Sequence, residues 1–343
     1  MAFQTVFKRY ELKYMITREQ KDRILRAMEP YMVQDKFGRS TIRNIYFDTD
    51  DFILARHSIA RPDFKEKLRI RSYAAASPDS TVFVELKRKF DHVVYKRRVA
   101  LPEHFAMKWI QGFAGRLSSS GTAPAGTAGS ITASATGSNG AKILHKELAA
   151  LPTQMTSEIN YFLNYYGTLR PAAFLSYDRL AYRMRDIPAS GSQSDIHRNG
   201  TGTGSSMPAS QTAPDFRVTF DENILFRDYD MSLGSDIYGT PLLDEGKVLM
   251  EIKCSGGIPL WMTQVLSEEH IYKTSFSKYG TAYSRYIQPE MQREAVALRQ
   301  IAAATQAGSE TITGGMGTSA GSVRRAPANI GRRTSSWLHY LGA

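Results

Sequence analysis

The sequence predicts an α+β fold: an eight-stranded antiparallel β tunnel, closed into a barrel with a polar basic lumen, and helices at its periphery. Residues 65–101 contain three short β-type runs separated by turn residues. About eight such runs occur along the chain, mostly joined by short loops or single helices. An antiparallel sheet with one polar and one apolar face can curl into a barrel. A net charge of +11 suits a lumen that holds an anion.

Residues 65–101 carry charged side chains at alternate positions, and alternate positions share one face of a strand. The polar face comprises Lys67, Arg69, Arg71, Glu85, Lys87, Lys89, Lys96 and Arg98. The opposite face comprises Leu68, Ile70, Val84, Leu86 and Val99. A charged face can simply be solvated, and this alternative stays open. Because two cations about 6 Å apart repel by roughly 3 kcal/mol at an effective dielectric near 20, we expect an anion to fill the crowded face.

The remaining elements follow from periodicity and capping residues. Further strands are predicted over residues 6–16, 41–48, 169–184, 215–227 and 247–254, and helices over 103–113, 143–166 and 258–271. Another helix is expected to begin after Thr17, which would form a capping box with Gln20, and to end at Pro30. Asp48 and Thr49 are expected to cap the short segment that follows them, and a metal contact is the alternative for Asp48.

Three segments have a composition too poor in large apolar residues to order themselves. Residues 114–141 and 188–214 are rich in Ala, Gly, Ser and Thr, and we expect flexible surface insertions there. Residues 303–343 have a similar composition with pairs of arginines, which predicts a disordered basic tail. Residues 1–290 would then form one domain.

The composition limits the class of protein. Hydrophobic residues make up 42% of the 343 residues, as in folded domains. The single cysteine, Cys254, is expected to pack as a small apolar residue rather than act as a nucleophile. The first residues are not of the secretory type and no run of about 18 apolar residues occurs, so we expect a cytoplasmic protein without a transmembrane segment. The basic charge predicts a polyanionic partner, and no zinc or RNP-type motif indicates specific nucleic-acid binding.

Nine segments carry a family pattern: RYELKYMI, IYFDTDD, KLRIRSY, FVELKRK, YKRRVAL, YDRLAYR, FRVTFDENI, MEIK and SFSKY. In this order they resemble the VTC-type polyphosphate polymerase domain, of the triphosphate tunnel metalloenzyme or CYTH-like superfamily. The likeness covers residues 6–285 apart from the two insertions. It implies an eight-stranded tunnel lined with basic residues. Eukaryotic members of the family transfer the γ-phosphate of ATP to a polyphosphate chain, with Mn²⁺ or Mg²⁺ as cofactor.

Position by position, the resemblance matches five basic residues to basic residues of the family's tunnel: Arg69, Arg71, Lys87, Arg179 and Arg217. We expect these five to hold the triphosphate and stabilise the transition state. The resemblance also implies phosphate contacts from Lys13 and Lys96 and product contacts from Ser277 and Lys278, for which a plain turn is the alternative. The shared polar faces add Lys67, Lys89, Arg98 and Lys253 to the candidate phosphate-binding set. Ser275 replaces a family lysine, so we expect one phosphate contact to be lost.

Carboxylates are the expected metal ligands, since hard divalent cations prefer oxygen. Glu251 matches the metal-binding glutamate of the family. Glu11 and Glu85 are further candidates, with pairing to neighbouring cations as the alternative. The CYTH branch has ExExK on its first strand, whereas Arg9 replaces the first glutamate here, which favours the polymerase branch. The sensing and membrane domains of eukaryotic members are not found in the sequence, so a free-standing, prokaryotic-type protein is expected.

Three functions therefore compete. The first is an ATP:polyphosphate phosphotransferase, a metal-dependent polyphosphate polymerase. The second is a tunnel triphosphatase that hydrolyses inorganic or nucleoside triphosphate. The third is a non-catalytic polyanion-binding module. Phosphoryl transfer needs mainly positioning and charge neutralisation, so the chemistry requires no serine or histidine nucleophile.

Overall fold

The computed structural model describes residues 10–60, 62–90, 93–119, 151, 153–185 and 215–312. Most of the two predicted insertions, and the chain beyond residue 312, lie outside these residues. The described chain divides into two compact units. The first unit takes its residues from Met1–Thr41, Tyr177–Asn223 and Leu243–Ser275, and the second from Ile42–Ser176, Ile224–Leu242 and Phe276–Ala343.

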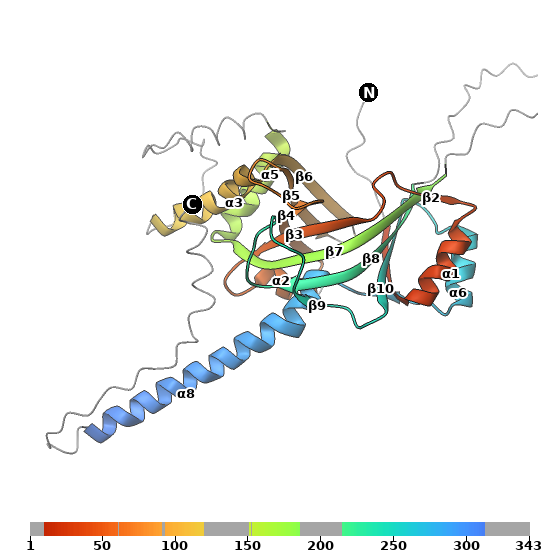
Figure 1. Cartoon of the computed structure of the whole chain (residues 1–343). Helices are drawn as coiled ribbons and strands as arrows, with labels where there is room; N and C mark the ends of the chain where they lie inside the picture. The colour runs from red at the N-terminus through yellow and green to blue at the C-terminus, as the bar shows by residue number, and fades with distance from the viewer. Residues whose placement is uncertain are drawn as a thin grey trace, which may run out of the picture. The chain divides into compact units, whose positions relative to one another are not determined.

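The first unit is built on an antiparallel sheet with strand order β11-β1-β10-β8-β7. Its strands are β1 (Tyr10–Thr17), β10 (Lys247–Cys254), β11 (Lys273–Thr274), part of β7 (Arg170–Met184) and part of β8 (Phe216–Arg227), with β2 (Met32–Gln34) paired to β7. Helices α1 (Arg18–Met28) and α6 (Leu260–Glu268) lie side by side (Figure 1). Their buried side chains Ile24, Met28 and Met262 pack on the apolar face of this sheet. Cys254 is buried in the same cluster, as predicted.

The predicted capping box of the first helix is confirmed. The backbone N–H of Gln20 donates to Thr17 Oγ1 at 3.2 Å, and the N–H of Thr17 donates to Gln20 Oε1 at 2.9 Å. Both bonds satisfy N–H groups that the first turn of a helix leaves unpaired. The helix ends at Met28, two residues before Pro30, which cannot continue it.

The second unit contains the strand order β7-β3-β4-β5-β6. Its strands are β3 (Ser40–Asp48), β4 (Phe64–Ser72), β5 (Thr81–Phe90), β6 (Val93–Pro102) and the remaining parts of β7 and β8, with β9 (Thr240–Pro241) paired to β8. Its helices are α2 (Ile53–Ala60), α3 (Glu103–Ser119), α5 (Thr153–Tyr166), α7 (Lys278–Ala282), the π-helix η1 (Tyr283–Ile287) and α8 (Gln288–Ile312). The three-stranded meander predicted over residues 65–101 is thus β4, β5 and β6.

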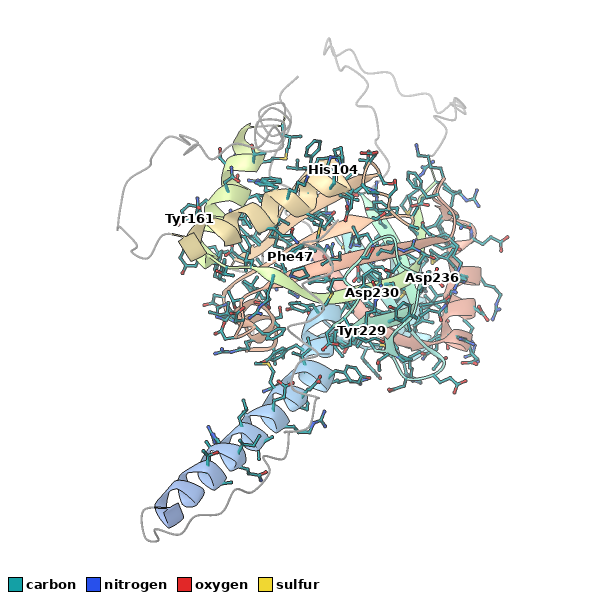
Figure 2. All side chains as sticks on the ribbon, turned by 60° about the vertical axis from the view of Figure 1, so that its left-hand side comes forward. Phe47, His104, Tyr161, Tyr229, Asp230 and Asp236 are labelled. Carbon is teal, nitrogen blue, oxygen red and sulfur yellow. The ribbon has the colours of Figure 1, made fainter. Side chains whose placement is uncertain are left out.

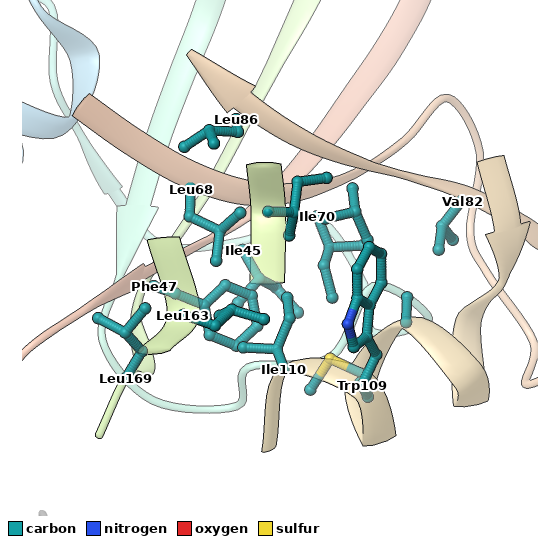
Figure 3. Packing of buried hydrophobic residues seen from close by; sticks show 14 of the residues in the cluster. Ile45, Phe47, Leu68, Ile70, Val82, Leu86, Trp109, Ile110, Leu163 and Leu169 are labelled. Carbon is teal, nitrogen blue, oxygen red and sulfur yellow. The ribbon is translucent and has the colours of Figure 1, made fainter. Parts of the chain in front are cut away.

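The apolar face of the meander packs under helices α3 and α5, which forms the core of the second unit. Figure 3 shows Leu68, Ile70 and Leu86 from the strands against Trp109 and Leu163 from the helices. All of them are buried. The alternation predicted from the sequence therefore holds along the meander, because the apolar side chains between the charged ones are buried in this core.

Eight of the strands have eight or more residues, and the described pairings of the meander and of β1, β10 and β8 are antiparallel. The α+β class, the large antiparallel sheet and the peripheral helices are confirmed. In the described part of the chain the path of paired strands ends at β11 and β6. Closure of this path into a barrel remains a prediction.

Two predicted irregular segments begin as helices. Helix α3 continues to Ser119, past the predicted start of the first insertion at residue 114. Helix α8 extends to Ile312, so the tail expected to be disordered from residue 303 is helical over its first ten residues. Ala302–Ala304 and their neighbours are good helix formers, and this propensity continues a helix that starts at Gln288. Within residues 10–312, no described helix has the length and apolar composition that a membrane span requires.

Helix α5 offers a test of the second core. Phe162 is 1% exposed in that core, whereas Tyr161, labelled in Figure 2, is 66% exposed. Phe162→Ala should lower the free energy of unfolding by about 3–5 kcal/mol, since it leaves a cavity. Tyr161→Ala should change it by less than about 0.5 kcal/mol. Urea denaturation monitored by circular dichroism measures both, and equal effects would contradict this packing.

Candidate functional site

The polar face of the second unit consists of cross-strand rows of charged residues. One row contains only lysines: Lys67 on β4 lies opposite Lys87 on β5, which lies opposite Lys96 on β6. The next row contains Arg69, Glu85 and Arg98 in the same strand order. Side chains directly opposite each other on an antiparallel pair share a face, and like charges in that position are destabilising. The cations of β4, β5 and β6 therefore share one face of the meander, as predicted, and positive charge is concentrated on that face.

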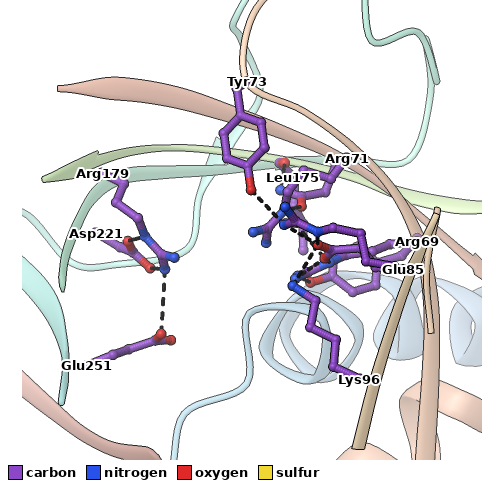
Figure 4. Close-up of polar contacts among 12 residues, drawn as sticks. Arg69, Arg71, Tyr73, Glu85, Lys96, Leu175, Arg179, Asp221 and Glu251 are labelled. Atoms are coloured by element: carbon purple, nitrogen blue, oxygen red, sulfur yellow. Dashed lines mark hydrogen bonds and ion pairs between the residues drawn. The ribbon is translucent and has the colours of Figure 1, made fainter. Parts of the chain in front are cut away.

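Glu85 is the centre of this face. We call Arg69, Arg71, Glu85, Lys96 and Arg98 the Glu85 cluster. The ammonium of Lys96 and Arg98 Nε lie 2.7 and 2.6 Å from Glu85 Oε1, and Arg69 Nη2 lies 2.7 Å from Oε2 (Figure 4). Arg71 Nε is 3.7 Å from Oε2. Burial by itself would raise the pKa of Glu85, but the cations, Arg69 first, hold this pKa well below its usual range.

Two buried tyrosines connect the Glu85 cluster to helix α2. Arg69 Nη1 donates to Tyr46 Oη at 2.7 Å, and the Tyr46 ring stacks on Tyr279 with centroids 4.8 Å apart. Tyr279 Oη donates to Asp48 Oδ2 at 2.7 Å. Asp48 also accepts the backbone N–H groups of Leu54 and Ala55 at 2.9 Å. The predicted capping role of Asp48 is confirmed. Asp48 also holds Tyr279, and Tyr279 supports the Tyr46 ring that contacts Arg69.

Ser277 and Lys278 lie where β11 gives way to α7, in the second unit. Ser277 Oγ accepts the backbone N–H of Gly280 at 3.0 Å, so it caps α7 rather than forming a plain turn. The same oxygen accepts a hydrogen bond from Lys67 Nζ at 2.8 Å. Lys278 is the first residue of the helix. The SFSKY segment is therefore tied to the lysine row. Lys89 is placed on the same face, opposite Lys65 of β4.

The polar face of the first unit has a different charge balance. On β1 and β10, Lys13 lies opposite Glu251 and Glu11 lies opposite Lys253. On β10 and β8, Glu251 lies opposite Thr219 and Lys253 lies opposite Arg217. Acidic and basic side chains thus alternate across the strands, whereas the meander of the second unit presents mainly cations.

Glu251 is the centre of this second face. Its carboxylate lies 3.1 Å from Lys253 Nζ, 3.5 Å from Arg179 Nη2 and 3.7 Å from Lys13 Nζ. We call Lys13, Arg179, Asp221, Glu251 and Lys253 the Glu251 cluster. Lys13 Nζ also lies 3.6 Å from Glu11. Arg217 is exposed on the same strand face. Burial by itself lowers the pKa of Lys253, and Glu251 opposes that shift.

Asp221 is a member of the site that the sequence reasoning did not assign. Its carboxylate accepts Arg179 Nε at 2.5 Å and Nη2 at 2.7 Å, a forked contact drawn in Figure 4. Asp221 is fully buried. Burial by itself would lower the pKa of Arg179, but the charge of Asp221 raises the pKa of Arg179 well above its ordinary value. A signal was present in the sequence, since Asp221 shares alternate positions with Arg217 and Thr219 in FRVTFDENI.

The divalent cation implied by the resemblance fits the first unit better than the second. Among the residues that the structure describes, no group of three or more His, Cys, Asp or Glu side chains suits a metal. Mg²⁺ commonly uses one or two carboxylates together with substrate phosphates, so Glu251 with Glu11 is an adequate protein contribution. The buried Thr219 Oγ1, opposite Glu251, has no hydrogen-bond partner. The contacts of Glu85 fit its alternative role, as the counter-ion of four cations. The ion pair of Glu11 with Lys13 fits the same alternative for Glu11.

The comparison with protein families agrees with the resemblance. The family described as VTC domain matches residues 8–188 and 209–287, more than half of the chain. A search among curated proteins found no match. Among solved structures, a proposed adenylate cyclase of Bacillus halodurans is 13% identical with a TM-score of 0.35 and covers 79% of this chain and 94% of its own. A proposed adenylate cyclase of Vibrio parahaemolyticus is 10% identical with a TM-score of 0.34 and covers 80% and 96%.

The pH dependence of stability tests the Glu85 cluster. Burial, with Arg98 and Arg69 nearby, lowers the pKa of Lys96 to about 8 against the attraction of Glu85. Between this pKa and the ordinary lysine value the unfolded chain binds more protons, so the free energy of unfolding should rise with pH. Relative to Lys96→Met, the wild type should gain about 1 kcal/mol from pH 7.5 to 10.5, a value reduced for solvent screening. A pH-independent difference in urea denaturation would contradict this.

Proposed function

Because the chain belongs to the VTC domain family, we propose that it is a polyphosphate polymerase that transfers the γ-phosphate of ATP to a polyphosphate chain. The observation that carries the proposal is the lysine row Lys67, Lys87 and Lys96 beside the Glu85 cluster. Three like charges directly opposite one another on paired strands are unfavourable in the absence of an anion. Four cations around one carboxylate leave that cluster with a positive charge that a polyphosphate would neutralise.

The chemistry assigned to the protein is positioning and charge neutralisation. A terminal oxygen of the polyphosphate chain forms a bond to the γ-phosphorus of ATP, and the bond from that phosphorus to the β–γ bridging oxygen breaks, releasing ADP. No proton has to be removed from the attacking phosphate oxygen. Arg69 and Arg71 on β4, Lys87 on β5, Arg179 on β7 and Arg217 on β8 would bind the phosphoryl oxygens. Guanidinium groups suit this role because they bind phosphate in a forked geometry.

The remaining candidate residues have supporting roles. Lys13, Lys67, Lys89, Lys96, Arg98 and Lys253 would hold phosphates along the polar faces, and Ser277 with Lys278 would contact the growing chain. Glu251, with Glu11, would hold Mn²⁺ or Mg²⁺, which when bound neutralises charge on the phosphate oxygens. The closed tunnel that the family resemblance implies is part of this proposal.

One assay separates this proposal from its competitors. Purified protein with ATP and Mn²⁺ should produce long-chain polyphosphate, measured by gel electrophoresis. Free phosphate alone would identify a triphosphatase, and no product would leave a polyanion-binding module. Glu251→Ala should abolish turnover, because it removes the proposed metal ligand. Glu269→Ala is the control, since Glu269 pairs with Arg23 on the helical side of the first unit. Full activity of Glu251→Ala would show that Glu251 does not hold the metal.

Arg69→Ala tests the anion site without turnover. It should weaken tripolyphosphate binding by about 1.5–3 kcal/mol, or roughly 10- to 150-fold in Kd, as for a charge-assisted hydrogen bond. Isothermal titration calorimetry measures the affinity. Arg88→Ala is a matched control, because Arg88 is also on the meander but contacts Glu66 and Glu158 on the opposite, helix-covered face. Equal affinities of the Arg69 and Arg88 variants would place Arg69 outside the anion site.

A further inference from the structure

Thr219 carries a buried hydroxyl with no hydrogen-bond partner, in the middle of the first unit's polar face. The residue is 6% exposed, and its Oγ1 is one of four buried polar side-chain atoms without a partner among the described residues. Buried polar groups in native proteins are almost always paired, so each exception calls for an explanation. An unpaired buried hydroxyl lowers the free energy of unfolding of the isolated protein unless a ligand or water binds to it.

The position of Thr219 points to a specific neighbour. It lies opposite Glu251 in the β8–β10 pairing, and Glu251 lies opposite Lys13 in the β1–β10 pairing. Cross-strand partners direct their side chains to the same face, so Thr219 and Glu251 project from neighbouring strands on the polar face, without a hydrogen bond between them. Two positions along β8, Asp221 is committed to its forked contact with Arg179. The side chains that β8 and β10 place at opposed positions here therefore carry a hydroxyl and a carboxylate.

We propose that Thr219 supplies a neutral oxygen ligand, directly or through a bound water, to the divalent cation that Glu251 would hold. The inference rests on the proposed function and extends its metal site from β10 to β8. A hydroxyl paired with a carboxylate is a suitable donor set for a hard cation, and phosphoryl-transfer sites elsewhere use serine or threonine with aspartate in this way. A hydroxyl also has a proton that it can donate to a phosphate oxygen while its lone pairs face the cation.

The alternative is that Thr219 merely fills the pleat, as β-branched residues commonly do. Thr219→Val distinguishes the two, because it removes the hydroxyl and keeps the shape. We expect it to weaken Mn²⁺ binding about tenfold, as loss of metal-supporting contacts does. It should leave the melting temperature of the metal-free protein unchanged or raised, since an unpaired buried group is removed. Thr219→Ser should keep Mn²⁺ affinity within about threefold of the wild type, because it retains the hydroxyl.

Mn²⁺ binding is measured by electron paramagnetic resonance of the free ion, with and without tripolyphosphate. Thr219→Ala provides a second hydroxyl deletion, so the test does not depend on the folding of one variant. If Glu251→Ala loses Mn²⁺ while both hydroxyl deletions keep wild-type affinity, Thr219 is not a ligand and the proposed Glu251 site stands. If Glu251→Ala also binds Mn²⁺ like the wild type, the metal assignment of the proposed function fails together with this inference. Loss of binding in both deletions with retention in Thr219→Ser supports it.

Discussion

One buried carboxylate allows the meander to carry its cationic face. Glu85 sits on the central strand, β5, with Arg69 opposite on one side and Arg98 opposite on the other, and it also pairs with Lys96. The attraction of these cations to one central carboxylate offsets their mutual repulsion. It also offsets the cost of burying charge, which is large for an unpaired group. The apolar face then packs against α3 and α5 without the cations leaving their side of the sheet. Glu85 therefore stabilises the fold and also holds four cations together in the proposed anion site.

The two polar faces differ in what they can bind. In the second unit, the lysine row follows directly on the Glu85 cluster, and positive charge exceeds negative charge. In the first unit, Glu11, Glu251 and Asp221 alternate with basic residues, and Thr219 adds an unpaired hydroxyl. A cationic face suits phosphate, whereas a mixed face with carboxylate oxygens suits a divalent cation together with its phosphate ligands. This difference supports the division of roles in the proposed polymerase.

Positioning groups complete both clusters, and those described below lie within the segments on which the resemblance depends, at positions to which the resemblance assigned no phosphate or metal contact. Asp221 holds Arg179 by two hydrogen bonds, and Tyr46 holds Arg69 while resting on Tyr279. Tyr279 is held in turn by Asp48, the cap of α2. Such contacts fix the direction of a guanidinium before a phosphate arrives, which lowers the entropy cost of binding. The SFSKY segment is bound to the same structure through Ser277 and Lys67.

The sequence by itself determined the alternation of Lys67 to Arg71 and of Glu85 to Lys89, the capping box at Thr17 and the cap at Asp48, because each depends on neighbours within a few positions of the chain. Only the tertiary structure decided that Glu85 would serve four cations, that Asp221 would hold Arg179, and that Thr219 would face Glu251 without a partner. These depend on strand register and burial, which bring together residues far apart in sequence. Helix α8 beyond residue 303 was missed for a related reason: composition describes a segment's average, whereas a helix already begun at Gln288 extends through residues that would not start one.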